Sequence, residues 1–330
     1  AYLKVANSPN TGLLESVEGG ERLGRYSFVL TQPELVIRTK GRHVEYETAG
    51  HVEVFDLPAD KDPLHLVQEA LDARCAPRLP QLPSMAGGCV GYLGWDLVHF
   101  FEELPETKPD ELAIWDTYLV FYDTIIVFDH SRHVLQLVHN ARIGGNPRYA
   151  YEQAQVELEK LAEQLRHRQV EVPALTPVEG SPEVPASNLT KAEFEASVSA
   201  AKEYIAAGDI IQVVVSQRLE RDFGGDPFSV YRALRTLNPS PYMYYLHCGD
   251  VQLIGTSPEV LLTVNDGTAR VRPIAGTRPR GVTVEDDRLL ERELLADEKE
   301  RAEHVMLVDL GRNDLRSEER RVGKECRSRW

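Results

Sequence analysis

The chain has 330 residues, which is enough for one large domain or two ordinary ones. Its 42% hydrophobic and 27% charged residues are ordinary for a globular protein and exclude a disordered or fibrous chain. The formal net charge of -15 argues against generic binding to nucleic acid or to an anionic membrane surface, because both need basic patches. An anionic small substrate is compatible with this charge if local cations oppose the field of the whole protein.

Strands joined by turns dominate the start of the chain. Residues 36–39 and 43–46 flank Lys40-Gly41-Arg42, which predicts a hairpin. Residues 63–73 have the apolar spacing of a helix, and Pro63 stands where a proline can begin one.

A glycine-rich stretch at 87–94 invites comparison with phosphate-binding loops. It has neither G-K-[ST] nor the spacing G-x-G-x-x-G, so a tight turn with close backbone packing is favoured. Further on, residues 118–128 and 133–139 are predicted to be two paired strands, and residues 148–168 a helix.

The middle of the chain changes composition abruptly. Residues 169–188 contain four prolines, a glycine, two serines and a threonine, which is typical of a linker or a surface excursion. Thr190 with Glu193 three residues later forms a capping-box signal for a helix that runs to about Ala207 and stops at Gly208. A buried strand is expected at 210–216.

Strand pairs mixed with helices indicate an α+β fold. The predicted division is an N-terminal domain at 1–168, the linker at 169–188 and a second domain at 189–315. Residues 316–330 lose the apolar pattern and read like a translated sequencing adapter, so they carry no fold expectation; a genuine basic tail is the alternative.

Cysteine usage and hydropathy indicate the cellular compartment. The cysteines form no CxxC pair and have no histidine at metal-ligand spacing, so a disulfide framework or zinc site is disfavoured and reduced thiols in the cytoplasm are expected. There is no recognisable signal peptide and no run of 18 apolar residues.

Three arginines stand close together at 272–281 in an otherwise acidic chain. Arginine suits carboxylate ligands, Gly276 permits close approach of a backbone, and Thr277 offers a hydroxyl. A carboxylate-binding loop and a solvated loop whose arginines pair with Asp286 and Asp287 are equally compatible with this composition.

An acidic segment follows at 297–308 and is helical by propensity, with its apolar end at 305–308 expected to be buried. Glu300 and Glu303 are three residues apart, so both project from one helix face. Two such carboxylates can hold a hard cation such as Mg²⁺, although a solvated acidic face is the commoner meaning of such a run. A further segment, NPSPYMYYL at 238–246, predicts a rigid turn that leads into a core strand.

Taken in order, the motifs resemble one family, the chorismate-utilising enzymes, and within it the anthranilate synthase large subunit (component I). They are LLESVEGGER at 13–22, GGCVGYLGWD at 87–96, GDIIQVVVSQR at 208–218, NPSPYMYYL at 238–246, GTSPE at 255–259, RPIAGTRPRG at 272–281 and DEKERAEHVMLVDLGRNDL at 297–315.

The resemblance implies a fold of largely antiparallel sheets with flanking helices, and a reaction. Chorismate is aminated at ring C2 with loss of the 4-hydroxyl, and pyruvate is eliminated to give anthranilate. Ammonia comes from a glutamine amidotransferase subunit (component II), Mg²⁺ is the cofactor, and L-tryptophan is the feedback inhibitor.

The resemblance also assigns residues. Glu303 is implied as the direct Mg²⁺ ligand with Glu300 nearby, and Gly276 and Thr277 as chorismate contacts. The allosteric tryptophan site is implied at Ser16, Pro241, Tyr242 and Met243. The family's catalytic histidine lies beyond Leu315, so no catalytic residue is assigned here, and the chain as written is not expected to turn over chorismate.

Two positions sort the subfamilies of this resemblance. Relatives that make aminodeoxychorismate commonly carry a lysine where this chain has Ala275, and relatives that make isochorismate or salicylate carry one where it has Gln212. Ammonia as nucleophile and anthranilate as product are therefore expected. Aminodeoxychorismate synthase component I is the alternative enzyme, and a tryptophan-binding regulatory module is the alternative of another class.

Overall fold

The computed structural model describes residues 1–6, 8–17, 24–77, 79–83, 85–105, 108–175 and 184–321, with backbone only from 316 onward. The chain divides into two compact units, which we describe separately. The first unit comprises Ala1–Glu171 and Leu234–Trp330, and the second comprises Val172–Ala233. The predicted boundaries at 168, 188 and 315 stay predictions.

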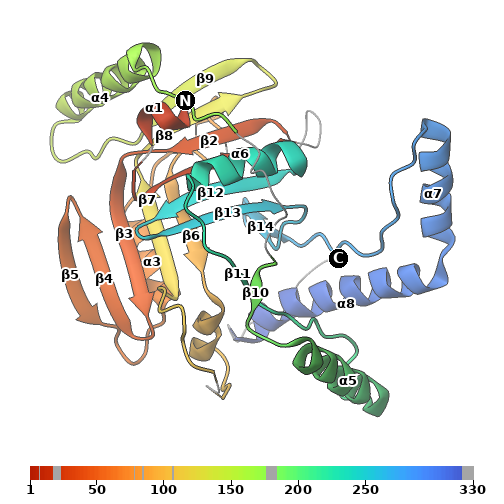
Figure 1. Cartoon of the computed structure of the whole chain (residues 1–330). Helices are drawn as coiled ribbons and strands as arrows, with labels where there is room; N and C mark the ends of the chain where they lie inside the picture. Colours follow the sequence, from red (N-terminus) through yellow and green to blue (C-terminus); the bar gives the residue numbers. More distant parts are fainter. Residues whose placement is uncertain are drawn as a thin grey trace. The chain divides into compact units, whose positions relative to one another are not determined.

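Two antiparallel sheets form the body of the first unit (Figure 1). The six-stranded sheet has the order β13-β12-β1-β2-β8-β9, and the five-stranded sheet has the order β5-β4-β3-β7-β6. The strands of the first sheet are β1 (Thr11–Glu15), β2 (Tyr26–Leu30), β8 (Thr124–Asp129), β9 (Val134–His139), β12 (Tyr242–Cys248) and β13 (Val251–Ser257). Those of the second are β3 (Pro33–Lys40), β4 (His43–Thr48), β5 (His51–Asp56), β6 (Gly88–Leu93) and β7 (Thr117–Tyr122).

The main core lies between the two sheets. Alternate residues of each strand face inward because successive side chains point to opposite faces of a sheet. Inward-facing side chains of both sheets join one buried cluster, which contains Leu30, Val36, Tyr118, Val120, Tyr122, Ile125, Val127, Val138, Leu246 and Cys248. The predicted α+β class is confirmed, with antiparallel sheets and flanking helices.

Helices cover the outer sheet faces. α3 (Pro63–Asp72) packs Ala70 against Ile37 and Phe121 of the five-stranded sheet. Its start is fixed by Asp62, whose side chain accepts hydrogen bonds from the Leu64 and His65 amides, and by Pro63 in the first turn. The helix and hairpin predicted at 36–73 are therefore confirmed.

Two further helices lie at the six-stranded sheet. α1 (Tyr2–Val5) and α4 (Pro147–His167) contact each other, and α4 contacts β9, beside which it lies in Figure 1. Tyr2 packs edge-on against Tyr245 of β12, with 5.4 Å between ring centroids. The helix predicted at 148–168 is confirmed.

Most of the glycine-rich stretch at 87–94 forms the strand β6 (Gly88–Leu93), and the expected tight turn is wrong. The expected close backbone packing is right, since a Cβ on Gly91 would lie 2.9 Å from Leu119 Cα and closer still to the Tyr118 carbonyl oxygen. Glycine is needed here because the neighbouring strand occupies the space of a side chain.

The predicted strand at 118–128 is in fact two strands. β7 ends at Tyr122, and β8 begins at Thr124 in the other sheet. The sequence hides the break because every residue of β7 is buried and β8 continues the apolar run. The predicted pairing with 133–139 is confirmed for β8, since Phe128 pairs with Leu135.

In the second unit, the capping prediction for α5 (Lys191–Ala207) is confirmed. The Thr190 hydroxyl accepts from the Glu193 amide, and Gly208 ends the helix in the left-handed conformation with φ +83°. The unit also holds a short ladder of β10 (Ala186–Ser187) with β11 (Leu219–Glu220), and α6 (Pro227–Leu237) begins in it. Of the predicted linker, residues 176–183 lie outside the described residues.

The buried strand expected at 210–216 is wrong. This segment has no regular structure, and Ile211 and Val214 are 78% and 83% exposed. Apolar and β-branched composition favours a strand only where another strand supplies the ladder. Within the described residues, this segment pairs with none.

The rest of the first unit follows β13. A small hairpin joins β14 (Thr263–Asn265) to β15 (Thr268–Arg270), and α7 (Val284–Ala296) and α8 (Glu298–Arg321) contact each other. The Thr283 hydroxyl caps α7 by accepting from the Asp286 amide. No described helix is both long and apolar enough to cross a membrane.

A buried ion pair gives the first unit a predictable response to acid. The side chain of Asp129 is 4% exposed and is joined to Arg25 Nη2 at 2.8 Å. The Arg25 hydrogen bond holds the pKa of the Asp129 carboxyl below its ordinary value.

This shift stabilises the folded state above the unfolded pKa of about 4, and the contribution is lost as the pH falls through the folded pKa. We therefore expect Asp129→Asn to lower the free energy of unfolding at pH 7 and to flatten its dependence on pH below about 4. Urea denaturation from pH 2 to 7 measures both effects. Parallel pH profiles for the two proteins would contradict this assignment.

Candidate functional site

The two predicted metal carboxylates lie on the covered face of α8. Glu300, Glu303 and Leu307 are half-buried and Gly311 is buried, at the spacing of three to four residues that defines one helix face. Val305 and Val308 are 66% and 37% exposed, so the expected burial of 305–308 is wrong for both of these residues. The helix also continues through this segment rather than ending there.

The segment 271–276 runs along this face of α8. A Cβ on Gly311 would lie 3.3 Å from Val271 Cγ1, and a Cβ on Gly276 would lie 2.9 Å from Glu300 Oε2. Five extended residues and eleven helical residues both span roughly 16 Å, which explains how one segment reaches both ends of the face.

Gly276 is therefore brought against Glu300. Its φ of +81° is a conformation that other residues rarely adopt, and an added Cβ would also approach Leu294 Cδ1 to 3.2 Å. The predicted chorismate contact and a predicted metal ligand are thus adjacent. Thr277, the other predicted contact, is exposed beside them.

Two of the three arginines of this loop, Arg278 and Arg280, have recorded carboxylate partners. Arg280 Nη2 lies 3.0 Å from Asp287 Oδ2, one of the pairs anticipated for a solvated loop. Asp286 instead caps α7 by accepting from the Thr283 hydroxyl at 2.8 Å. Arg278 contacts Glu293, Asp297 and Glu300, none of which the sequence had suggested.

The donors of this site suit a hard cation. Within the described ranges, no group of three or more histidine, cysteine, aspartate or glutamate side chains could hold a metal ion. Mg²⁺, however, is commonly bound by one or two carboxylates, with water and substrate oxygens completing its shell. Glu303 and Glu300 fit that pattern and would be the residues that hold it.

The four predicted tryptophan-site residues are also brought together. β1 pairs with β12 so that Glu15 is opposite Met243, and the Val17 amide donates to the Ser240 carbonyl at 3.0 Å. Ser16 thus lies opposite the start of β12, where Pro241 and Tyr242 are half-buried and Met243 is buried. The predicted turn into a core strand at 238–246 is confirmed.

One ion pair at this second site was not foreseen. Arg235 Nε, near the end of α6, lies 3.0 Å from Glu15 Oε2. It ties the residue before Ser16 to the helix that precedes the NPSPYM turn. Sequence spacing could not suggest a contact between residues 220 positions apart.

The two positions that sort the subfamilies lie in different units. Ala275 is half-buried next to Gly276 in the first unit. Gln212 is exposed in the second unit, within the irregular segment 210–216.

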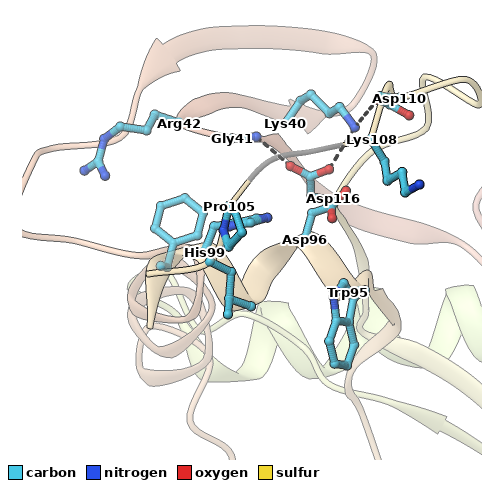
Figure 2. A pocket seen from close by; sticks show the side chains of 12 residues that line it. Lys40, Gly41, Arg42, Trp95, Asp96, His99, Pro105, Lys108, Asp110 and Asp116 are labelled. Atoms are coloured by element: carbon cyan, nitrogen blue, oxygen red, sulfur yellow. Dashed lines mark hydrogen bonds and ion pairs between the residues drawn. The ribbon is translucent and has the colours of Figure 1, made fainter. Parts of the chain in front are cut away.

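The first unit also has a cavity of about 700 Å³ (Figure 2). Lys40 lines this cavity, and its Nζ lies 2.5 Å from Asp110 Oδ2 and 2.9 Å from Asp116 Oδ1. The Gly41 amide also donates a hydrogen bond to Asp116. These contacts pair one of its cations, Lys40, with two of its anions, and none of the predicted site residues lines it. We therefore assign it no role in the chemistry.

Sheets, loop and helix together match a known class of protein. The family model described as "chorismate binding enzyme" matches residues 16–326, so the chain belongs to the chorismate-binding enzyme family. Two curated relatives are named anthranilate synthase component 1. That of Pseudomonas putida is 45% identical over 95% of this chain and 64% of its own length, and that of Aquifex aeolicus is 44% identical over 92% and 61%.

A solved structure agrees in fold. The crystal structure of anthranilate synthase component I from Streptococcus pneumoniae TIGR4 is 32% identical, with a TM-score of 0.69 over 88% of this chain and 61% of that one. The chain is thus a homologue of anthranilate synthase component 1 and spans about 61 to 64% of the length of these relatives.

Proposed function

We propose that this chain belongs to the large subunit of an anthranilate synthase, which converts chorismate and ammonia to anthranilate and pyruvate. The observation that carries the proposal is the close approach of Gly276 to Glu300, because it brings the arginine-rich loop to the acidic face of α8. Homology to proteins named anthranilate synthase component 1 supports the same reaction.

The proposed roles follow from charge. Chorismate is a dianion and the chain has a net charge of -15, so its site needs local positive charge. Bound Mg²⁺ would supply that charge and polarise the ring towards loss of hydroxide. Glu303 and Glu300 would hold the metal, while the backbone at Gly276 and the Thr277 hydroxyl would contact the substrate carboxylate.

The choice of product rests on two residues. Ala275 next to the site cannot act as a nucleophile, and Gln212 cannot act as a base, so ammonia is the proposed nucleophile. A glutamine amidotransferase subunit is the proposed source of ammonia, and the cytoplasm the proposed location. The para-aminobenzoate branch is the competing enzyme function.

The test is an assay of products. We would join residues 1–315 to the remaining part of the Pseudomonas putida relative and supply chorismate, Mg²⁺ and ammonium. Anthranilate detected by its fluorescence and by chromatography is the expected result. Aminodeoxychorismate, isochorismate or salicylate as the main product would refute the assignment, and the unextended chain is expected to form no anthranilate.

Tryptophan is the proposed inhibitor. The pairing of β1 with β12 supports this, because it brings Ser16 to the start of β12, where the other residues of the proposed tryptophan site lie. We expect Ser16→Ala to weaken inhibition of the extended enzyme by tryptophan about tenfold, because one buried hydrogen bond is worth about 1 to 1.5 kcal/mol. Anthranilate formation without tryptophan should stay within twofold of wild type. Unchanged inhibition would remove Ser16 from the site.

A regulatory module that binds only tryptophan is the second candidate, because all four residues of the proposed tryptophan site are present in this chain. Calorimetric titration of the unextended chain distinguishes the two functions. Binding of tryptophan alone supports the module, whereas binding of chorismate with Mg²⁺ supports the enzyme subunit.

A further inference from the structure

Arg278 forms an ion pair with Glu300, one of the two proposed metal ligands. Its side chain is 21% exposed and stands between the end of α7 and the start of α8. Its Nη2 lies 2.6 Å from Asp297 Oδ2, its Nε 3.4 Å from Glu293 Oε1, and its Nη1 3.5 Å from Glu300 Oε1. One guanidinium group therefore forms ion pairs with three carboxylates.

These three contacts differ in strength. The bond to Asp297 is short and charge-assisted, whereas 3.5 Å to Glu300 is long for a hydrogen bond. Asp297 is itself fixed, because it accepts from the Lys299 amide at 3.0 Å and the Glu300 amide at 3.2 Å at the start of α8. Arg278 is thus anchored on Asp297 and holds Glu300 loosely.

The anchor also sets the position of the loop. Arg278 Nη1 donates to the Thr277 carbonyl at 3.0 Å, directly after Gly276. A cation that approaches Glu300 would meet the positive charge of Arg278 within a few ångströms, and the repulsion would weaken its binding.

We propose that Arg278 is an internal counter-cation that occupies Glu300 when no metal is bound and gives up this carboxylate to the divalent cation while it stays anchored on Asp297. This inference rests on the proposed function, since it takes Glu300 and Glu303 as the metal-binding carboxylates. Arg278 is then a positioning residue whose presence lowers the affinity for the metal. If Arg278 only supported the structure of the site, its presence would instead raise that affinity.

The experiment measures Mn²⁺ and Mg²⁺ binding to the full chain by isothermal calorimetry, with Mn²⁺ electron paramagnetic resonance as a second readout. We expect Arg278→Met to tighten binding about tenfold, because it removes a unit charge close to the site without adding a polar group. Arg280→Met is the matched control: Arg280 is 90% exposed and pairs with Asp287, so its removal should change affinity less than twofold.

Further variants keep the result interpretable. Arg278→Lys retains a charge but cannot reach Asp297 and Glu300 together, so it should tighten binding by about threefold even if Arg278→Met folds poorly. Glu303→Gln tests the metal site itself and should abolish binding in both the wild-type and the Arg278→Met backgrounds.

The outcomes separate the two proposals. Equal or weaker binding in both Arg278 variants, with binding still lost in Glu303→Gln, would overturn the counter-cation and leave the metal site standing. Binding that Glu303→Gln leaves unchanged would overturn the metal site and, with it, the role of Arg278. No binding by any variant at millimolar metal would also overturn the inference, because removal of Arg278 should reveal the site.

Discussion

Replacing Gly91 by alanine should destabilise the first unit by about 3 kcal/mol, which is the upper range for an overpacked core. The new Cβ would overlap the Tyr118 carbonyl oxygen and lie 2.9 Å from the Tyr118 carbonyl carbon and from Leu119 Cα, all of them backbone atoms of β7. β7 is buried on both faces, between the inter-sheet core and α3, so it cannot move aside cheaply. Urea denaturation followed by tryptophan fluorescence measures the loss.

Gly144→Ala is the matched control. An added Cβ at Gly144 would have no atom within 4 Å, so we expect its midpoint of unfolding to stay close to that of wild type. If Gly91→Ala unfolded at the same urea concentration as Gly144→Ala, the close approach of β6 to β7 would be wrong.

Gly276→Ala should lower kcat/KM for chorismate about a hundredfold in the extended enzyme described above. Alanine at φ +81° is strained, and its Cβ would press on Glu300 and Leu294. The loop must then shift away from the carboxylates, and a displacement of about 1 Å can cost a hundredfold in rate. Steady-state kinetics at saturating Mg²⁺ gives the value, and the melting temperature shows whether the fold is intact.

Gly267→Ala separates backbone strain from the contact. Gly267 has a similar φ of +74°, but a Cβ there would meet nothing within 4 Å. We expect this variant to keep wild-type kcat/KM within threefold. Equal losses in the two variants would mean that strain alone, and not the contact with Glu300, makes glycine necessary at position 276.

Local signals in the sequence predicted local structure well. The helix between Thr190 and Gly208 is predicted correctly, because its capping box and its terminal glycine are signals that each act within a few positions of a helix end. The hairpin at 36–46 was equally local. The strand expected at 210–216 was wrong because its existence depends on a distant partner, which composition does not reveal.

In the candidate site, too, local spacing predicts some features, and the others depend on distant packing. Helical spacing was enough to put Glu300 and Glu303 on one face of α8. It could not show that Arg278 reaches Asp297 and Glu300, since those contacts depend on how the loop at 271–278 packs along the helix. Similarly, no local pattern indicates that β1 pairs with β12, and it was family resemblance that grouped Ser16 with Pro241, Tyr242 and Met243.

The pairing of β1 with β12 has a consequence for how the protein is made. β1 lies between β2 and β12 in the six-stranded sheet, yet Glu15 and its partner Met243 are separated by most of the chain. At about 5 to 20 residues per second, a ribosome needs roughly 10 to 50 s to add the residues between them. Until then β1 presents an open edge, which invites association between nascent chains. Completion of this sheet must therefore wait for β12, although four of its six strands, β1, β2, β8 and β9, emerge long before it.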